Sequence, residues 1–322
     1  MRIINLSEEF TPRHEGIFFG LDTENEMPAD VTIEVVDMAS EEVLARKLLR
    51  SVTTAEVNVA PYLQPNEEYT PSKSTHTTFK AAPSRCCIVR SGDDLSAPIT
   101  TSVNRYRVSL PTVVSAMPSL RTISYGEVDE VLILTNGADI LTANIVADTG
   151  ESLSIDYSAA TGAAILLIST KDFGKKFRTL EVELLCNGEY FGSLRYTVMP
   201  LHKGAVRLAW ISRSGSIERY TFPLGVKSQL NSVKESIDTP EGRRVVRAVS
   251  ESILSLKSRY EASATIEALA EIVSSPRVWL EGATGCREVE VTSSTVDKNL
   301  FNEPDIVAIN IREWRKEEPL QW

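Results

Sequence analysis

Side chains suited to catalysis are few in this chain and lie far apart. The three histidines are His14, His76 and His202, and no local motif places one of them with a serine or cysteine as a base with its nucleophile. The sequence has no G-x-S-x-G, P-loop or H-E-x-x-H pattern. We therefore predict no catalytic residues and a non-enzymatic protein, whose histidines are exposed or hydrogen-bonded.

The four cysteines are Cys86, Cys87, Cys186 and Cys286, and they form no C-x-x-C pair. A structural zinc site has no support without such a pair. Reduced thiols are the favoured interpretation, and a disulfide from Cys86 or Cys87 to a distant cysteine is the alternative. We expect neither a metal nor a cofactor.

Three pairs of adjacent carboxylates are candidates for glycosidase residues: Glu8-Glu9, Asp93-Asp94 and Glu317-Glu318. Adjacent residues of a strand point to opposite faces, and on a loop they usually face water. Catalytic carboxylates need a defined separation around a sugar, which the sequence does not show. Solvated charge is the favoured interpretation. Calcium bound by Asp93-Asp94 is the alternative, although no EF-hand spacing is present.

One basic cluster has aromatic residues within it: Lys171, Lys175, Lys176 and Arg178, around Phe173 and Phe177. It is the best nucleic-acid candidate in the chain. The chain as a whole is acidic, with 34 Lys and Arg against 44 Asp and Glu and a net charge of -10. Acidity of this size argues against a cationic nucleic-acid footprint. We predict a solvated loop or a subunit contact here, and no nucleic-acid partner.

Residues 204–223, GAVRLAWISRSGSIERYTFP, have the alternation of a β-hairpin. The turn lies at Ser212–Ser216, and Pro223 is expected to end the second strand. Its aromatic residues have three interpretations: a sugar platform, part of the core, or the anchors of a protein interface, where aromatics and arginine are enriched. The candidate interface residues are Arg207, Trp210, Arg213, Arg219, Tyr220 and Phe222.

Short alternating segments separated by turns continue along the chain and predict a mainly β protein. Strands are expected at 31–36 and 43–48, and again at 130–135 and 140–147, where Asn136-Gly137 predicts a hairpin turn. A chain of 322 residues is long enough for two or three domains. We predict two β-sandwich-like domains, residues 1–112 and 113–200, followed by a smaller α+β domain, residues 201–322.

The C-terminal third contains the one predicted helix, Thr265–Ser274, because Ile266, Leu269 and Val273 share a face. Ser263 or Thr265 is the expected cap of its N-terminus. The spacing in Val245–Leu256 fits either a helix or strands, and we favour strands.

Three segments of the chain resemble structural proteins of tailed phages and prophages of gut Bacteroidetes, found in the tail, baseplate or neck. The hairpin is similar to their W-x-N-x-x-G-x-x-x-x-Y-x-F motif, with Ser212 where Asn is usual. The strand, turn and strand that lead to AEVNVAPYL (55–63), and a helix followed by SPRVWL (275–280), are similar to other parts of those proteins. In pattern the resemblance covers residues 28–63, 130–223 and 264–312.

The resemblance implies a structural component of a virion that assembles as a ring or multimer with copies of itself and with other virion proteins. The alternative is a carbohydrate-binding or adhesin-like β protein of a gut bacterium. The N-terminus lacks the apolar core of a signal peptide, and no run approaches the roughly 20 apolar residues of a membrane span. We therefore expect synthesis in the host bacterial cytoplasm, location in the virion, and no membrane span.

Overall fold

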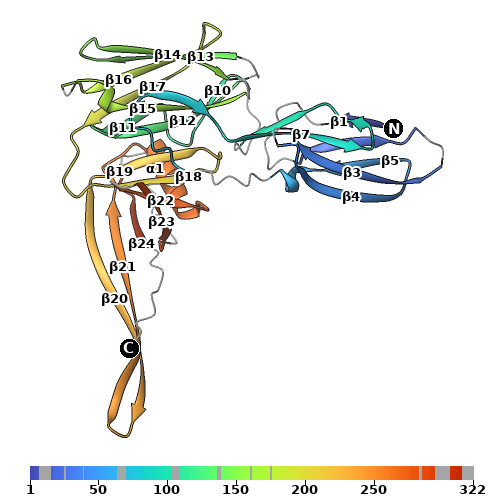
Figure 1. Cartoon of the computed structure of the whole chain (residues 1–322). Helices are drawn as coiled ribbons and strands as arrows, with labels where there is room; N and C mark the ends of the chain where they lie inside the picture. The colour runs from blue at the N-terminus through green and yellow to red at the C-terminus, as the bar shows by residue number, and fades with distance from the viewer. Residues whose placement is uncertain are drawn as a thin grey trace.

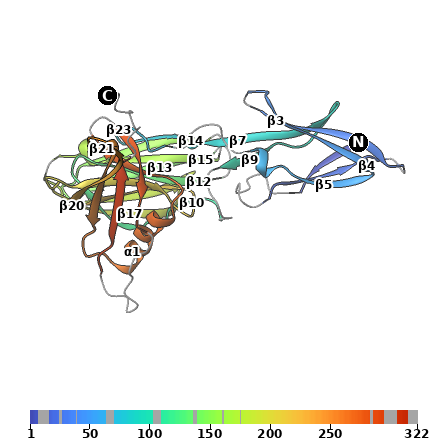
Figure 2. The same ribbon diagram turned by 90° about the horizontal axis from the view of Figure 1, so that it is seen from below.

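The structure is a computed structural model of the chain, and it confirms a mainly β fold, with 61% of residues in strands. It describes residues 1–6, 16–24, 27–38, 40–63, 70–102, 109–135, 139–159, 162–174, 176–282, 285–293 and 305–313. Figures 1 and 2 show an N-terminal sandwich extended to one side of a central sandwich. A C-terminal sheet lies against the central sandwich and carries a long projecting ribbon (Figure 1).

The N-terminal sandwich packs a three-stranded sheet on a five-stranded one. The smaller sheet has the order β1 (Arg2–Asn5), β2 (Phe18–Asp22) and β5 (Thr54–Asn58). The larger has the order β4 (Val43–Val52), β3 (Ala29–Asp37), β7 (Ser84–Ser91) and β8 (Asp94–Leu95), with β9 (Ile99–Ser102) also on β7. The 3-10 turn η1 (Ala60–Tyr62) follows β5. Alternate residues such as Phe19 and Ile33 point inward and form one buried cluster between the sheets.

The central sandwich packs a four-stranded sheet on a five-stranded one. The first has the order β10 (Thr112–Val114), β12 (Val128–Leu134), β15 (Ala163–Ser169) and β6 (Thr78–Ala81). The second has the order β11 (Leu120–Ser124), β17 (Glu189–Met199), β16 (Thr179–Cys186), β13 (Asp139–Ala147) and β14 (Ser152–Ala159). The 3-10 turn η2 (Thr170–Asp172) follows β15. Every residue of β15 is buried, which explains why its sequence is a continuous apolar run.

The C-terminal part is a seven-stranded sheet with one helix packed on it. Its order is β19 (Ile217–Phe222), β18 (Val206–Ile211), β22 (Val278–Gly282), β23 (Gly285–Val291), β24 (Ala308–Glu313), β21 (Gly242–Lys257) and β20 (Leu224–Thr239). The helix α1 (Ser263–Ala270) continues into the 3-10 turn η3 (Glu271–Ser274). The predicted hairpin at 204–223 is confirmed, since β18 and β19 pair antiparallel from Val206–Phe222 to Ile211–Ile217.

The strands β20 and β21 form a ribbon that leaves the body of the molecule (Figure 1). Strand β19 ends at Phe222, directly before Pro223, as predicted, and the chain enters β20 at Leu224. The favoured strand interpretation of 245–256 is confirmed, as one strand within β21. Among the described residues, β24 pairs with β21 only at residues 253–257, near the body.

The predicted hairpin at 130–147 is wrong. Its two strands exist as β12 and β13, but β12 pairs with β10 and β15 while β13 pairs with β14 and β16. They belong to opposite sheets of the central sandwich, and Asn136-Gly137 lies outside the described residues. A turn signal indicates where the chain reverses, and the same reversal can cross between sheets instead of closing a hairpin.

Two further predictions differ from the structure. Strand β6 lies within the segment assigned to the first domain, yet it pairs with β15 of the central sandwich. The helix begins at Ser263, and its N-cap is Ala262, with no hydrogen bond from a capping side chain. Packing of Ile266 and Leu269 into the core stabilises this helix in place of the predicted serine or threonine cap.

Candidate functional site

The two faces of the β18–β19 hairpin carry different chemistry and meet different neighbours. Leu208 and Trp210 face the C-terminal core together with Tyr220 and Phe222, where α1 also packs. The alternate residues Arg207 and Arg219 point the opposite way, toward β12 of the central sandwich. The period of two along a strand therefore separates an aromatic face from an arginine face.

Arg207 joins the hairpin to the central sandwich through Glu127, and it also pairs with Glu281 within the C-terminal sheet. Its Nη1 donates to Glu127 Oε2 at 2.6 Å, and its Nε lies 2.9 Å from Glu281 Oε2 on β22. Its Nη2 also donates to the carbonyl oxygen of Val128 at 2.7 Å. Glu127 in turn accepts from the Thr221 hydroxyl of β19 at 2.7 Å. Arg207 thus has a carboxylate partner on each side of the contact between the two parts of the chain.

Arg219 makes a second connection and includes the segment that leads from the N-terminal sandwich. Its Nη2 lies 3.1 Å from Glu130 Oε2, and its Nε lies 3.1 Å from Glu281 Oε1. The same Nη2 donates to the carbonyl oxygen of Ser72 at 2.9 Å, while the Ser72 N–H donates to Glu130 Oε2 at 3.0 Å. We call Arg207, Arg219, Glu127, Glu130 and Glu281 the ionic junction, because together they connect three parts of the chain.

The burial of these ion pairs determines how much the loss of one partner would destabilise the protein. The side chains of Arg219 and Glu130 are 2% and 1% exposed. Removing one partner of a buried ion pair leaves the other charge without compensation, which is strongly unfavourable. The ionic junction therefore specifies one arrangement of the three parts. Each arginine of the hairpin pairs across the contact with a carboxylate of the central sandwich, Arg207 with Glu127 and Arg219 with Glu130.

A second buried polar cluster lies beside the ionic junction. Arg121 donates to Asp129 Oδ2 at 2.8 Å, and the Tyr196 hydroxyl donates to the same oxygen at 2.8 Å. Burial alone would raise the pKa of Asp129, but the guanidinium groups of Arg121 and Arg207 outweigh it and hold this pKa below its usual value. Asp129 therefore stays charged as a structural anchor.

Glu218, from β19, reaches the connector that leads to β11. It accepts hydrogen bonds from the Ser115 hydroxyl at 2.8 Å and from the Ala116 N–H at 2.8 Å. Burial raises the pKa of Glu218 in spite of the charge of Arg121 and these hydrogen bonds. The hairpin is thus attached to the central sandwich from both of its faces.

The six predicted interface residues divide into three groups. Trp210, Tyr220 and Phe222 are buried within the chain, so the interpretation of these aromatics as core is confirmed and they form no exposed sugar platform. Arg207 and Arg219 are buried at the contact between two parts of one chain. Arg213 is exposed on the turn, where its backbone N–H donates to Glu271 Oε2 at 2.9 Å. A role for Arg213 in contacts between copies stays a prediction.

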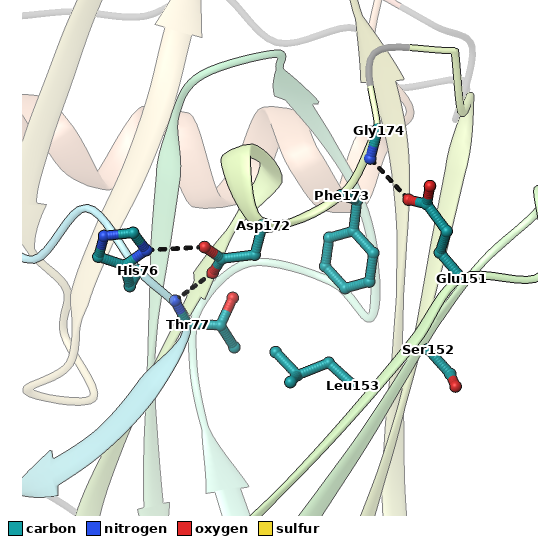
Figure 3. A pocket seen from close by; sticks show the side chains of 8 residues that line it. All are labelled: His76, Thr77, Glu151, Ser152, Leu153, Asp172, Phe173 and Gly174. Carbon is teal, nitrogen blue, oxygen red and sulfur yellow. Dashed lines mark hydrogen bonds and ion pairs between the residues drawn. The ribbon is translucent and has the colours of Figure 1, made fainter.

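A shallow pocket of about 590 Å³ lies on the central sandwich, next to η2 (Figure 3). Figure 3 shows His76 and Thr77 directed at Asp172, and Gly174 directed at Glu151. The His76 Nδ1 lies 2.9 Å from Asp172 Oδ1, and the Thr77 N–H donates to Asp172 Oδ2 at 2.5 Å. Glu151 accepts from the Gly174 N–H at 2.6 Å. Asp172 and Glu151 each bind a backbone N–H and so hold a segment of the chain in place. The pair of His76 and Asp172 therefore has a structural role here.

The Asp172 contacts predict a measurable pH dependence. Burial alone would raise the pKa of Asp172, but hydrogen bonds from Thr77 and His76 outweigh it and lower the pKa from its ordinary value of 3.8. Ionised Asp172 therefore adds to the free energy of unfolding above pH 3.8, the ordinary pKa. This contribution disappears as the pH falls through the lowered pKa of the folded state. We expect Asp172→Asn to reduce the free energy of unfolding by about 0.5–1.5 kcal/mol near neutral pH.

Urea unfolding of wild type and Asp172→Asn, near neutral pH and near pH 3, measures this effect. The difference between the two proteins should shrink in acid. Asp93→Asn is the matched control, because Asp93 is exposed on a turn. A difference that stays constant between the two pH values would contradict the assignment.

Of the other candidate residues, Phe173 of the basic cluster also lines this pocket. His202 and Asp93-Asp94 are exposed, whereas His14, Glu8-Glu9, Glu317-Glu318 and Lys175 lie outside the described residues. Phe173 and Phe177 of the basic cluster are buried in the central core. Across the described ranges, no three His, Cys, Asp or Glu side chains gather as metal ligands would. The part of the chain that the structure describes contains no helix long and apolar enough to cross a membrane.

The four cysteines form no disulfide in the described structure, in agreement with the favoured interpretation of the sequence. Burial raises the pKa of Cys186 to about 11, so this thiol stays protonated at neutral pH. Cys286 has a raised pKa for the same reason.

Comparison of this chain with known proteins gave matches among solved structures. No family model matches it, and no curated protein matches it. Among solved structures, a Salmonella alpha-2-macroglobulin mutant is similar at a TM-score of 0.22 and 7% identity, over 92% of this chain and 24% of the other. The chain thus spans about a quarter of that protein.

Two other solved structures are similar at the same low level. A tetra-tandem repeat from the extending region of a large adhesion protein has a TM-score of 0.22 and 8% identity, over 96% of this chain and 80% of that one. Immunoglobulin domains 1–4 of Sidekick-1 have a TM-score of 0.18 and 11% identity, over 80% and 72% of the two chains. Likenesses at these TM-scores carry no argument about function.

Sequence reasoning missed the carboxylate half of the ionic junction. The sequence pattern predicts a strand at Glu130 and indicates no role for Glu127 or Glu281. One signal was present: Glu130 directly precedes the apolar run VLIL (131–134), and a charged residue beside a buried run needs a buried partner. Its partner Arg219 is 89 residues away, and no local pattern connects the two.

Proposed function

We propose that this chain is a non-enzymatic structural subunit of a phage virion, in the tail, baseplate or neck, which assembles with copies of itself and with other virion proteins. The short motifs shared with phage structural proteins support the virion part of this proposal. The projecting ribbon supports the assembly part, and it is the observation that carries the proposal.

The distal ribbon, residues 230–252, is two-stranded. In the described part of the chain its strands pair only with each other, because β24 reaches no further than Ile253. An isolated two-stranded hairpin is marginally stable in water, and open strand edges are templates for pairing with another chain. A ribbon of this length is therefore well suited to being covered by a partner in an assembly.

The buried charges support a structural role as well. The carboxylates of the ionic junction hold parts of the chain together, and so do Asp129 and Glu218. A subunit of a mechanical assembly needs this kind of internal rigidity, because its contacts must keep a fixed geometry. The carbohydrate-binding alternative is less well supported, because its candidate sugar platform of Trp210, Tyr220 and Phe222 is buried.

Shortening the ribbon tests the proposal. Gln229 and Ile253 face each other across the ribbon, so an Asn-Gly turn can replace residues 230–252 and close a shorter hairpin. We expect the full chain to form rings or other multimers, with masses that are multiples of 35.6 kDa, and the shortened chain to be a monomer. Light scattering after size exclusion, with negative-stain imaging of the same peak, measures both.

Thermal unfolding followed by circular dichroism provides the control, since the body of the shortened chain should melt as in wild type. A full chain that stays monomeric at every soluble concentration would contradict self-assembly. If the shortened chain formed the same multimers, the ribbon would not be part of the contact between copies. Binding of the full chain to a glycan array would favour the carbohydrate-binding alternative.

A further inference from the structure

The two carboxylate oxygens of Glu130, in the ionic junction, differ in their hydrogen bonds. Its Oε2 accepts from the Ser72 N–H at 3.0 Å and lies 3.1 Å from Arg219 Nη2. Its Oε1 is buried and has no hydrogen-bond partner among the described residues. A buried acceptor without a partner is costly, and each oxygen of a carboxylate can accept two hydrogen bonds. The Oε1 atom therefore indicates a donor that the side chains around it do not supply.

Two further polar groups lie close to the same carboxylate. The Ser72 hydroxyl is buried and has no hydrogen-bond partner in the described structure. It belongs to the residue whose backbone N–H already binds Glu130 Oε2. The Nζ of Lys80, on β6, lies 3.9 Å from Glu130 Oε1, which is too long for a hydrogen bond. A carboxylate oxygen, a hydroxyl and an ammonium group thus gather without hydrogen bonds to one another.

The separation of Lys80 and Glu130 is typical of a bridged contact. A polar contact longer than about 3.5 Å often has a water molecule between its two groups. Internal waters make about three hydrogen bonds, to buried polar groups that otherwise have no partner. The three groups here suit one water, because the ammonium group donates, the carboxylate accepts, and the hydroxyl does either.

The charges around the site select a neutral ligand. A metal cation is a poor match, because Lys80 and Arg219 already place two positive charges beside the Glu130 carboxylate. An anion is a poor match as well, because Glu130 and Glu281 both lie next to Arg219. A small molecule that donates and accepts hydrogen bonds satisfies all three groups, and water is the smallest one.

We propose that one ordered water molecule is bound between Glu130 Oε1, the Ser72 hydroxyl and Lys80 Nζ. It accepts a hydrogen bond from Lys80, donates one to Glu130, and forms its third with Ser72. Both ends of the segment 72–80 are thereby attached to a single carboxylate of β12. This segment leads from the N-terminal sandwich into β6, so the water completes its attachment to the central sandwich. The inference goes beyond the proposed function and does not depend on it.

A crystal structure of the full chain, at a resolution that shows ordered water, tests the site directly. We expect an isolated density peak within about 3.2 Å of all three polar atoms. A Lys80 Nζ that binds Glu130 Oε1 directly, with no peak between them, would overturn the inference. A peak with contacts of about 2.0–2.6 Å would overturn it too, by indicating a metal ion.

A double-mutant cycle tests the same site in solution. Ser72→Ala and Lys80→Met each remove one partner of the water, and each is expected to lower the folding equilibrium constant about twofold to tenfold. The double variant should lose less than the product of the two single losses, because both side chains act through the same water. Urea unfolding followed by circular dichroism measures all three variants. Losses that simply multiply would contradict a shared water.

Ser158→Ala is the matched control, since Ser158 is exposed on β14. It should leave the folding equilibrium nearly unchanged, and its effect should multiply with that of Lys80→Met. Coupling of the control to Lys80→Met, equal to that of Ser72→Ala, would overturn the inference. Light scattering of the same samples records their mass separately. A chain that is always monomeric would therefore contradict the proposed assembly and leave the water site standing.

Discussion

Arg219→Ala is expected to lower the free energy of unfolding by about 3–5 kcal/mol, because it removes one partner of a buried ion-pair network. The Arg219 guanidinium lies 3.1 Å from both Glu130 and Glu281. Alanine would leave the Glu130 carboxylate, which is 1% exposed, without its closest cation. It would also remove the hydrogen bond to the carbonyl oxygen of Ser72 and loosen the segment from the N-terminal sandwich.

Arg213→Ala is the matched control from the same hairpin. Arg213 is exposed, so its replacement should change the free energy of unfolding by no more than about 0.5 kcal/mol. Urea unfolding at neutral pH, followed by circular dichroism, measures both variants. Equal losses from the two substitutions would contradict the importance of the ionic junction.

A double variant separates the ion pair from the packing of the arginine stem. Arg219→Met with Glu130→Leu removes both charges and keeps most of the volume, and such replacements of buried pairs are often neutral or stabilising. The double variant should therefore be more stable than Arg219→Met alone. If it were less stable by the sum of both single losses, the two side chains would not be coupled.

Trp210→Ala is expected to cost about 3–5 kcal/mol of unfolding free energy, because it empties a large part of the C-terminal core. Trp210 is 0% exposed and belongs to the cluster that contains Tyr220 and Ile266. Its indole Nε1 is buried without a hydrogen-bond partner in the described structure. Trp210→Phe therefore loses no hydrogen bond and should cost much less than Trp210→Ala.

Thermal and urea unfolding followed by circular dichroism measure this series, with Tyr190→Ala as the control, since Tyr190 is 62% exposed. The series also separates two interpretations of the hairpin aromatics. If Trp210 anchored a contact between copies, its replacement would weaken the multimer and spare the stability of the monomer. The structure predicts a loss of stability in the monomer itself.

The local features of this architecture, its strands and their two faces, could be predicted from the sequence. Alternation along 206–211 and 217–222 predicted the hairpin and placed Leu208 and Trp210 on one face, because side chains of a strand alternate with a period of two regardless of its partners. The apolar run of β15 likewise indicated a buried strand. Patterns of this kind depend only on neighbouring residues, which is why they can be read without the fold.

Pairing between distant segments was decided by the tertiary structure. The strands at 130–135 and 140–147 were predicted, yet they lie in opposite sheets, since the choice of partner depends on apolar area buried by the whole sandwich. The helix at 263–270 lacks the expected cap for a similar reason, because its packing on the C-terminal sheet outweighs a single hydrogen bond.

The ionic junction shows the same division for charges. Arg207 and Arg219 were singled out from the hairpin, but whether they faced water, another copy or this chain depended on Glu127, Glu130 and Glu281. Those carboxylates lie far away in the sequence, and they are brought together only when the central and C-terminal sheets pack. The sequence by itself thus determined the strands and their two faces, whereas the fold decided what each face meets, because burial and charge compensation are properties of the whole chain.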